Sequence, residues 1–138
     1  MGRVKLLLII LFASFISCDP VYNARIVNET NQRQLLVIEF DSVELKKSWE
    51  GRDYLPFLKS YPGYTNINSF RFDTIKLIKY FIIQPNSSFP LSGANKNNYK
   101  LFNKILIGNN KIQLKNKEEI IKAFEKTSET QSQLVIKD

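Results

Sequence analysis

The residues that could carry acid–base chemistry in this chain are carboxylates, because its 138 residues include 13 Asp and Glu but no His. Two carboxylates can serve as general acid and base, as in glycoside hydrolysis. The candidates are Glu39, Asp41, Glu44, Glu50, Asp53 and Asp73. Their spacing matches no catalytic motif, and there is no Gly-rich phosphate loop and no zinc or calcium ligand spacing. We therefore expect no catalytic residue, no metal site and no cofactor.

The single cysteine, Cys18, points to a different chemistry. A lone Cys forms no intrachain disulfide, and without His it lacks the base that activates a Cys nucleophile. It follows two basic residues, Arg3 and Lys5, and an apolar run over residues 6–15. This run is shorter than the roughly 20 residues of a membrane span, and Pro20 ends it. The pattern is typical of an export signal.

The four residues that end this segment, Phe15-Ile16-Ser17-Cys18, resemble a bacterial lipobox. Phe15 departs from that pattern, which usually has Leu there. The resemblance implies that residues 1–17 are a signal peptide, that Cys18 carries the lipid and that residues 18–21 are a short tether. The alternative is an ordinary secretory signal that is cut nearby. A lipobox followed by Asp19 resembles small lipoproteins of the Bacteroidetes, and the abundance of Asn, Lys and Ile resembles proteins of AT-rich genomes. We therefore expect a cell-envelope protein anchored to a membrane, the outer membrane first.

The net charge of +7 is spread along the chain. Nucleic-acid binding needs a clustered basic stripe or a known module, and neither is present, so no nucleic acid is expected. An excess of Lys can still attract anionic lipid or glycan surfaces. The expected partners are the membrane, through the lipid anchor, and an envelope protein or glycan.

Apolar alternation with a period of two predicts the elements that must position any site. The predicted strands cover residues 21–27, 34–40, 42–47, 68–73, 74–84, 101–107, 112–114 and 133–137. Residues 74–84 are predicted to be one long strand or two strands run together. They are largely apolar on both faces, which indicates a central position, with Lys76 and Lys79 near an end or a bulge. Turns are expected at residues 85–93 and 108–111.

One amphipathic helix is predicted over residues 116–127, with Asn116 as its N-cap and Glu119 three residues later. About seven or eight strands with one short helix before the last strand are typical of an antiparallel β-sandwich, immunoglobulin- or transthyretin-like. We expect residues 22–138 to form a single β-rich domain.

Residues 46–66 are predicted to be a long loop, rich in aromatic and turn residues. Its candidate binding surface consists of Trp49, Tyr54, Tyr61 and Tyr64, because aromatic side chains offer rigid area with a polar tip. The alternative, which we favour, is that these side chains close one end of the sandwich, since large aromatics are usually buried.

Two short motifs, Asp41-Ser42-Val43 and Asp73-Thr74-Ile75, resemble the O-glycosylation acceptor sequence of Bacteroidetes. The resemblance implies modification of Ser42 and Thr74. Asn28 and Asn86 lie in Asn-x-Ser/Thr sequons, which would matter in a eukaryotic source.

Three functions follow from these features. The first is a lipid-anchored, non-catalytic binding module. The second is an inhibitor or immunity-type lipoprotein that inserts a protruding loop, residues 85–93, into a foreign enzyme. The third and least favoured is a carboxylate-based hydrolase, which requires two acidic side chains in one cleft.

Overall fold

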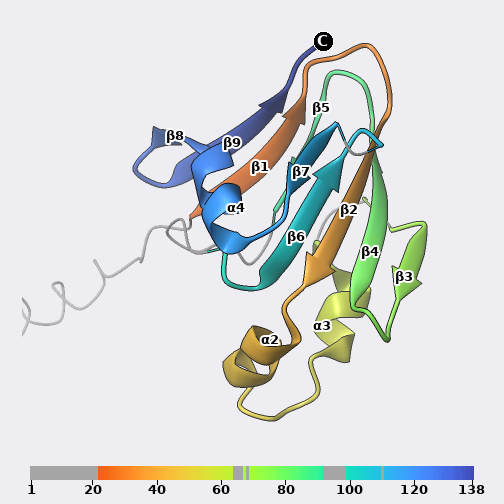
Figure 1. Cartoon of the computed structure of the whole chain (residues 1–138), viewed down its shortest axis with the longest axis vertical. Helices are drawn as coiled ribbons and strands as arrows, with labels where there is room; N and C mark the ends of the chain where they lie inside the picture. Colours follow the sequence, from red (N-terminus) through yellow and green to blue (C-terminus); the bar gives the residue numbers. More distant parts are fainter. Residues whose placement is uncertain (1–21, 64–66, 68, 92–98, 110) are drawn as a thin grey trace, which may run out of the picture.

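The computed structural model describes residues 22–63, 67, 69–91, 99–109 and 111–138. Within them the chain is mainly β and forms nine strands, three short helices and two sheets (Figure 1). The prediction of a β-sandwich with a short helix before the last strands is confirmed.

Sheet A has four strands in the order β5 (Ser87–Pro90), β1 (Asn23–Asn28), β9 (Gln131–Ile136) and β8 (Glu125–Ser128). Neighbouring strands are antiparallel except for β1 and β9, which are parallel. Parallel neighbours need a long crossover, and the segment between β1 and β9 supplies it because it contains all of sheet B.

Sheet B has five antiparallel strands in the order β3 (Arg71–Asp73), β4 (Ile78–Ile83), β2 (Gln34–Phe40), β6 (Phe102–Ile107) and β7 (Ile112–Leu114). The hairpin turn predicted after β6 is confirmed. Gly108 and Asn109 adopt φ angles of 63° and 52° there, which Gly and Asn tolerate better than other residues.

The core lies between the inner faces of the two sheets. Its members include Ile26, Phe89 and Leu134 from sheet A, and Leu36, Ile38, Phe81 and Ile105 from sheet B. Helix α3 (Leu55–Ser60) packs on the inner side of sheet B, since the buried Lys79 of β4 donates to the carbonyl of Leu58. In Figure 1 helices α2 (Ser42–Ser48) and α3 lie at the end of β2 from which the chain leaves sheet B.

Helix α2 corrects the prediction of a strand over residues 42–47. The alternation of Val43 and Leu45 suits a strand, but Asp41 caps a helix by accepting hydrogen bonds from the amides of Val43 and Glu44. Glu44 in the first turn and Lys46 and Lys47 in the last complement the helix dipole. The cap at Asp41 therefore favours a helix more strongly than the alternation of Val43 and Leu45 favours a strand.

Three other boundaries differ from the prediction. Residues 46–66 are not one loop, because Pro56 at the start of α3 favours a helix there. Residues 74–84 are not one strand, because residues 74–77 form a turn before β4 and Leu77 has a φ of 54°. Residues 85–93 contain strand β5, which pairs with β1.

Helix α4 (Lys117–Ala123) confirms the predicted C-terminal helix and its N-cap, since the side chain of Asn116 accepts a hydrogen bond from the amide of Glu119. The helix ends earlier than predicted, because Phe124 is already extended and leads into the unpredicted strand β8. Ile120 and Phe124 are buried and join α4 to the core.

Candidate functional site

The outer face of sheet B is the most unusual surface among the described residues. It consists of Leu35, Val37, Ile78, Tyr80, Ile82 and Leu106, which alternate with the core residues of the same strands. The strand register sets them side by side, with Leu35 opposite Ile82, and Val37 between Tyr80 and Leu106. These six side chains form one continuous apolar patch that points away from the core, and we call it the apolar face.

Sheet A has a different outer surface. At the positions of strands β5, β1 and β9 that alternate with core residues, five side chains are polar and three are apolar. The polar ones are Asn23, Arg25, Ser88, Gln131 and Gln133, and the apolar ones are Val27, Pro90 and Val135. Antiparallel sheets commonly pair one apolar face with one polar, solvated face, as sheet A does. Sheet B departs from this rule. On the apolar face Ile82 is 38% exposed and the other five side chains are half-buried, and a contiguous apolar patch that solvent reaches often marks an interaction site.

The border of the apolar face towards β3 is aromatic and cationic. Phe70 is 61% exposed, and its ring lies 6.1 Å from that of Tyr80. The guanidinium of Arg71 lies 5.0 Å from the centre of the Tyr80 ring, a cation–π contact. Tyr and Arg are the residue types most enriched among energetically dominant interface residues, so this border has the composition of a binding site.

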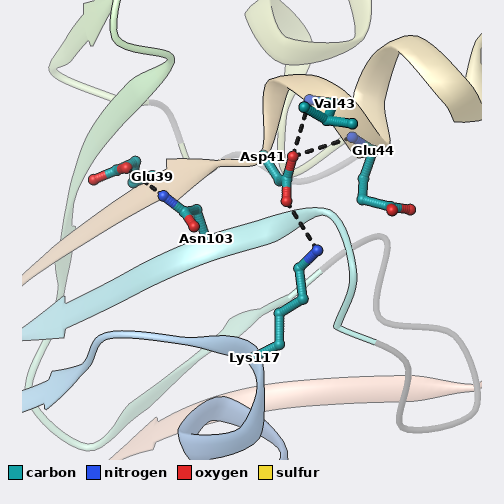
Figure 2. A network of polar contacts seen from close by, with 6 residues as sticks. All are labelled: Glu39, Asp41, Val43, Glu44, Asn103 and Lys117. Atoms are coloured by element: carbon teal, nitrogen blue, oxygen red, sulfur yellow. Dashed lines mark hydrogen bonds and ion pairs between the residues drawn. The ribbon is translucent and has the colours of Figure 1, made fainter.

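A polar network borders the apolar face where β2 ends (Figure 2). Asn103 Nδ2 donates to Glu39 Oε1 at 2.6 Å, and Lys117 Nζ lies 2.8 Å from Asp41 Oδ2. Two shallow hollows, of about 530 and 220 Å³, share Asp41 and Asn103 in their walls. Glu39 and Asp41 both line the smaller one, so two of the predicted acid–base candidates do lie together.

The contacts of these two carboxylates suit structure more than catalysis. Partial burial raises the pKa of Asp41, but the hydrogen bond and the charge of Lys117, with the amides of Glu44 and Val43, outweigh it and leave that pKa below its ordinary value. Asp41 is therefore an anion that caps helix α2 and pairs with Lys117, and it is unsuited to donate a proton. Glu39 is bonded to Asn103, and its second oxygen lies 3.9 Å from Lys104 Nζ. Within the described residues, no cluster of three or more metal-ligating side chains occurs.

The other carboxylate candidates lie apart from a shared cleft. Glu44 is half-buried on α2, and Glu50 is exposed after it. Asp53 and Asp73 accept backbone hydrogen bonds from Leu55 and from Ile75 and Lys76, which are local turn contacts. Backbone hydrogen bonds, from Lys76 first, lower the pKa of Asp73, although slight desolvation opposes this.

The predicted aromatic surface is not an exposed patch. Tyr61 is 2% exposed and packs edge-on against Phe40 at 5.0 Å, so its prediction as a surface residue is wrong. Trp49 and Tyr54 are half-buried against the core, and the Trp49 ring lies 4.7 Å from Phe57. Tyr64 lies outside the described residues. Trp49, Tyr54 and Tyr61 help α2 and α3 to close the end of the sandwich, as the favoured alternative predicted.

The two glycosylation-like motifs share one local geometry. Asp41 and Asp73 each accept hydrogen bonds from the amides two and three residues later. Ser42 and Thr74, which directly follow these two aspartates, are exposed. The aliphatic residues that follow are also exposed, Val43 by 70% and Ile75 by 93%. Both hydroxyls are thus accessible, whereas the sequon residue Asn28 is fully buried and Asn86 is exposed.

The described residues form a two-sheet β-sandwich in which no other described element covers the apolar face of sheet B. Comparison with protein-family models, with curated proteins and with solved structures gives no match. None of the helices in the described part of the chain is long and apolar enough to cross a membrane. Cys18 and the predicted signal segment lie outside the described residues.

Proposed function

We propose that this protein is a non-catalytic binding module of the bacterial cell envelope, anchored by a lipid on Cys18, that holds a protein partner on the apolar face of sheet B. The observation that carries the proposal is the contrast between the two outer surfaces of the sandwich. Most outer side chains of sheet A are polar, with Val27, Pro90 and Val135 as the exceptions. The apolar face of sheet B has six apolar side chains, of which Ile82 is exposed and five are half-buried, with an exposed Phe70 at their border.

The chemistry of the face favours a protein over a glycan. Five of its six side chains are aliphatic, whereas polar tips and several aromatic rings would be needed to orient a sugar. Arg71, stacked on Tyr80 at the border, adds the kind of anchor that protein interfaces use.

The anchor is supported by the sequence of residues 1–20 alone. Tyr22, the first described residue, is only four residues from Cys18, so an extended tether spans at most about 14 Å. A lipid on Cys18 would therefore hold the start of β1 close to the membrane surface. The outer membrane is the membrane that we propose.

Two alternatives lose support. The inhibitor hypothesis needed a protruding loop at residues 85–93, but Ser87–Pro90 is a strand paired with β1. The hydrolase hypothesis needed two acidic side chains in one cleft, and Glu39 and Asp41 do line one shallow hollow. Asp41, however, caps helix α2 and pairs with Lys117, which favours its charged form over that of a proton donor.

Photo-crosslinking tests the proposal. A photoreactive amino acid replaces Val37 on the apolar face, and a matched variant carries it at Val135, in the central strand β9 of sheet A. We expect adducts in the envelope from position 37 and few from position 135. No adducts from position 37, or equal yields from the two positions, would refute the proposed binding surface.

A further inference from the structure

Resting on that proposed function, we infer that the partner on the apolar face is a second copy of this chain, packed sheet against sheet. The first reason is shape. A flat face of aliphatic side chains is the surface with which β-sheets pack on one another, about 10 Å apart and with strands aligned within about 30°. Sheet B already packs in this way on its inner side, and its central strands β2 and β4 are apolar on both sides.

Size is the second reason. The three central strands of sheet B are six or seven residues long, and the edge strands β3 and β7 have three residues each. At about 4.8 Å per strand and about 3.4 Å per residue, the apolar face and its border together have a footprint of roughly 400 Å². Two copies in contact thus cover about 800 Å² of flat area. The accessible surface that they bury is larger, because side chains make each face uneven, and it approaches the roughly 1,000 Å² that a specific interface needs. The face is large enough for a weak dimer and too small for an obligate one.

Charge is the third reason. Four charged side chains of the sheet B strands flank the apolar face: the cations Arg71 and Lys104 and the anions Glu39 and Asp73. They balance, although the chain as a whole has a net charge of +7. A two-fold dimer brings the same patch together twice, so it requires a self-complementary surface. This face avoids the repulsion that any Lys-rich surface would cause.

Anchoring would strengthen such a dimer. Two copies with lipids in one membrane share a thin layer, which raises their effective concentration well above that of the free protein. A dissociation constant on the order of 10 µM in solution is then sufficient for a populated dimer at the membrane.

Sedimentation equilibrium of the full chain, purified from membranes in density-matched detergent, tests the inference. We expect a monomer–dimer equilibrium whose dissociation constant rises at least tenfold in Val37→Lys and is unchanged in Val135→Lys. Tyr80→Lys, on the neighbouring strand, is the second variant in case Val37→Lys fails to fold, and circular dichroism checks both.

Several results would overturn the second-copy inference. They are a wild type that stays monomeric well above the expected constant, equal weakening by Val37→Lys and Val135→Lys, or crosslinks from position 37 to residues 1–21 of the same chain. A monomer that crosslinks from position 37 to a different envelope protein would overturn this inference alone and leave the proposed function standing. A monomer without adducts from position 37 would overturn both.

Discussion

The ammonium nitrogen of Lys79 lies 2.6 Å from the carbonyl oxygen of Leu58, near the C-terminal end of α3. It also donates to the carbonyls of Tyr61 at 3.0 Å and Lys59 at 3.2 Å. Lys79 is 1% exposed and belongs to the inner side of β4. Burial lowers its pKa, while the three carbonyl oxygens favour the charged form. This lysine fixes α3 on the inner side of sheet B.

Replacing Lys79 by Met is expected to lower the free energy of unfolding by about 2 kcal/mol or more, because three carbonyl oxygens lose their buried donor. Urea denaturation followed by circular dichroism measures this. Lys76→Met, in the exposed turn before β4, is the control and should change stability by less than about 0.5 kcal/mol. Equal stabilities of the two variants would show that the Lys79 contacts contribute nothing.

Asp41 leads to a prediction about pH. Its pKa in the folded protein lies below the ordinary value of 3.8, so its contribution is present above about pH 4 and is lost as the pH falls through the lowered pKa. Asp41→Asn keeps a capping side chain but removes the charge that pairs with Lys117. The variant should be less stable than the wild type at pH 7, by at most about 1 kcal/mol for so exposed a pair.

This difference should shrink as the pH falls from 5 to 3. Urea unfolding across that range measures it, with Glu50→Gln at an exposed site as the control. A difference that stays constant with pH would mean that the ion pair with Lys117 does not stabilise the fold.

Asn28 joins β1 to the sheet B side of the sandwich. Its side-chain nitrogen donates to the carbonyls of Gln32, Ile83 and Gln84, and its oxygen accepts from the amide and hydroxyl of Thr30. Asn28→Ala should destabilise the protein by about 2–3 kcal/mol, because these buried groups lose their partners. Thermal unfolding measures the loss, and Asn23→Ala, on the polar outer surface of sheet A, should have little effect. An unchanged melting temperature in Asn28→Ala would contradict this role.

Much of the fold could be predicted from the sequence, because most elements carry local signals. Strand β2 has its predicted bounds, and Asn116 with Glu119 identified the start of α4. The alternation of Val43 and Leu45 misled because seven residues fit a strand and a helix equally well, and only the cap at Asp41 distinguishes them. The turn before β4 was hidden because its residues continue the apolar pattern.

The apolar face could not be predicted as a site. In the sequence, strands β2 and β4 are apolar on both of their faces. That pattern predicts a central strand that is buried on both sides. Sequence periodicity cannot show that only one of the two sides is covered. Nor could it show how Lys79 is accommodated, because the carbonyl oxygens around it come from a helix some twenty residues earlier.

Modification at Ser42 and Thr74 remains a prediction, and both hydroxyls are exposed beside an aspartate that fixes the turn. Intact mass of the protein from its native host should exceed the lipidated polypeptide by two glycans. Ser42→Ala and Thr74→Ala should each remove one, and Ser48→Ala, outside the motif, should remove none. Unmodified peptides at both positions would exclude the modification.

The central claim, that the apolar face of sheet B is covered in the envelope, is tested most directly by thiol labelling of Val37→Cys and Val135→Cys. Each introduces one free thiol, since the proposed lipid occupies the sulfur of Cys18. In isolated envelopes position 37 should react at least about tenfold more slowly than position 135, because the partner shields it, and the two rates should converge after dilution in detergent. Equal rates at both positions in intact envelopes would contradict the account.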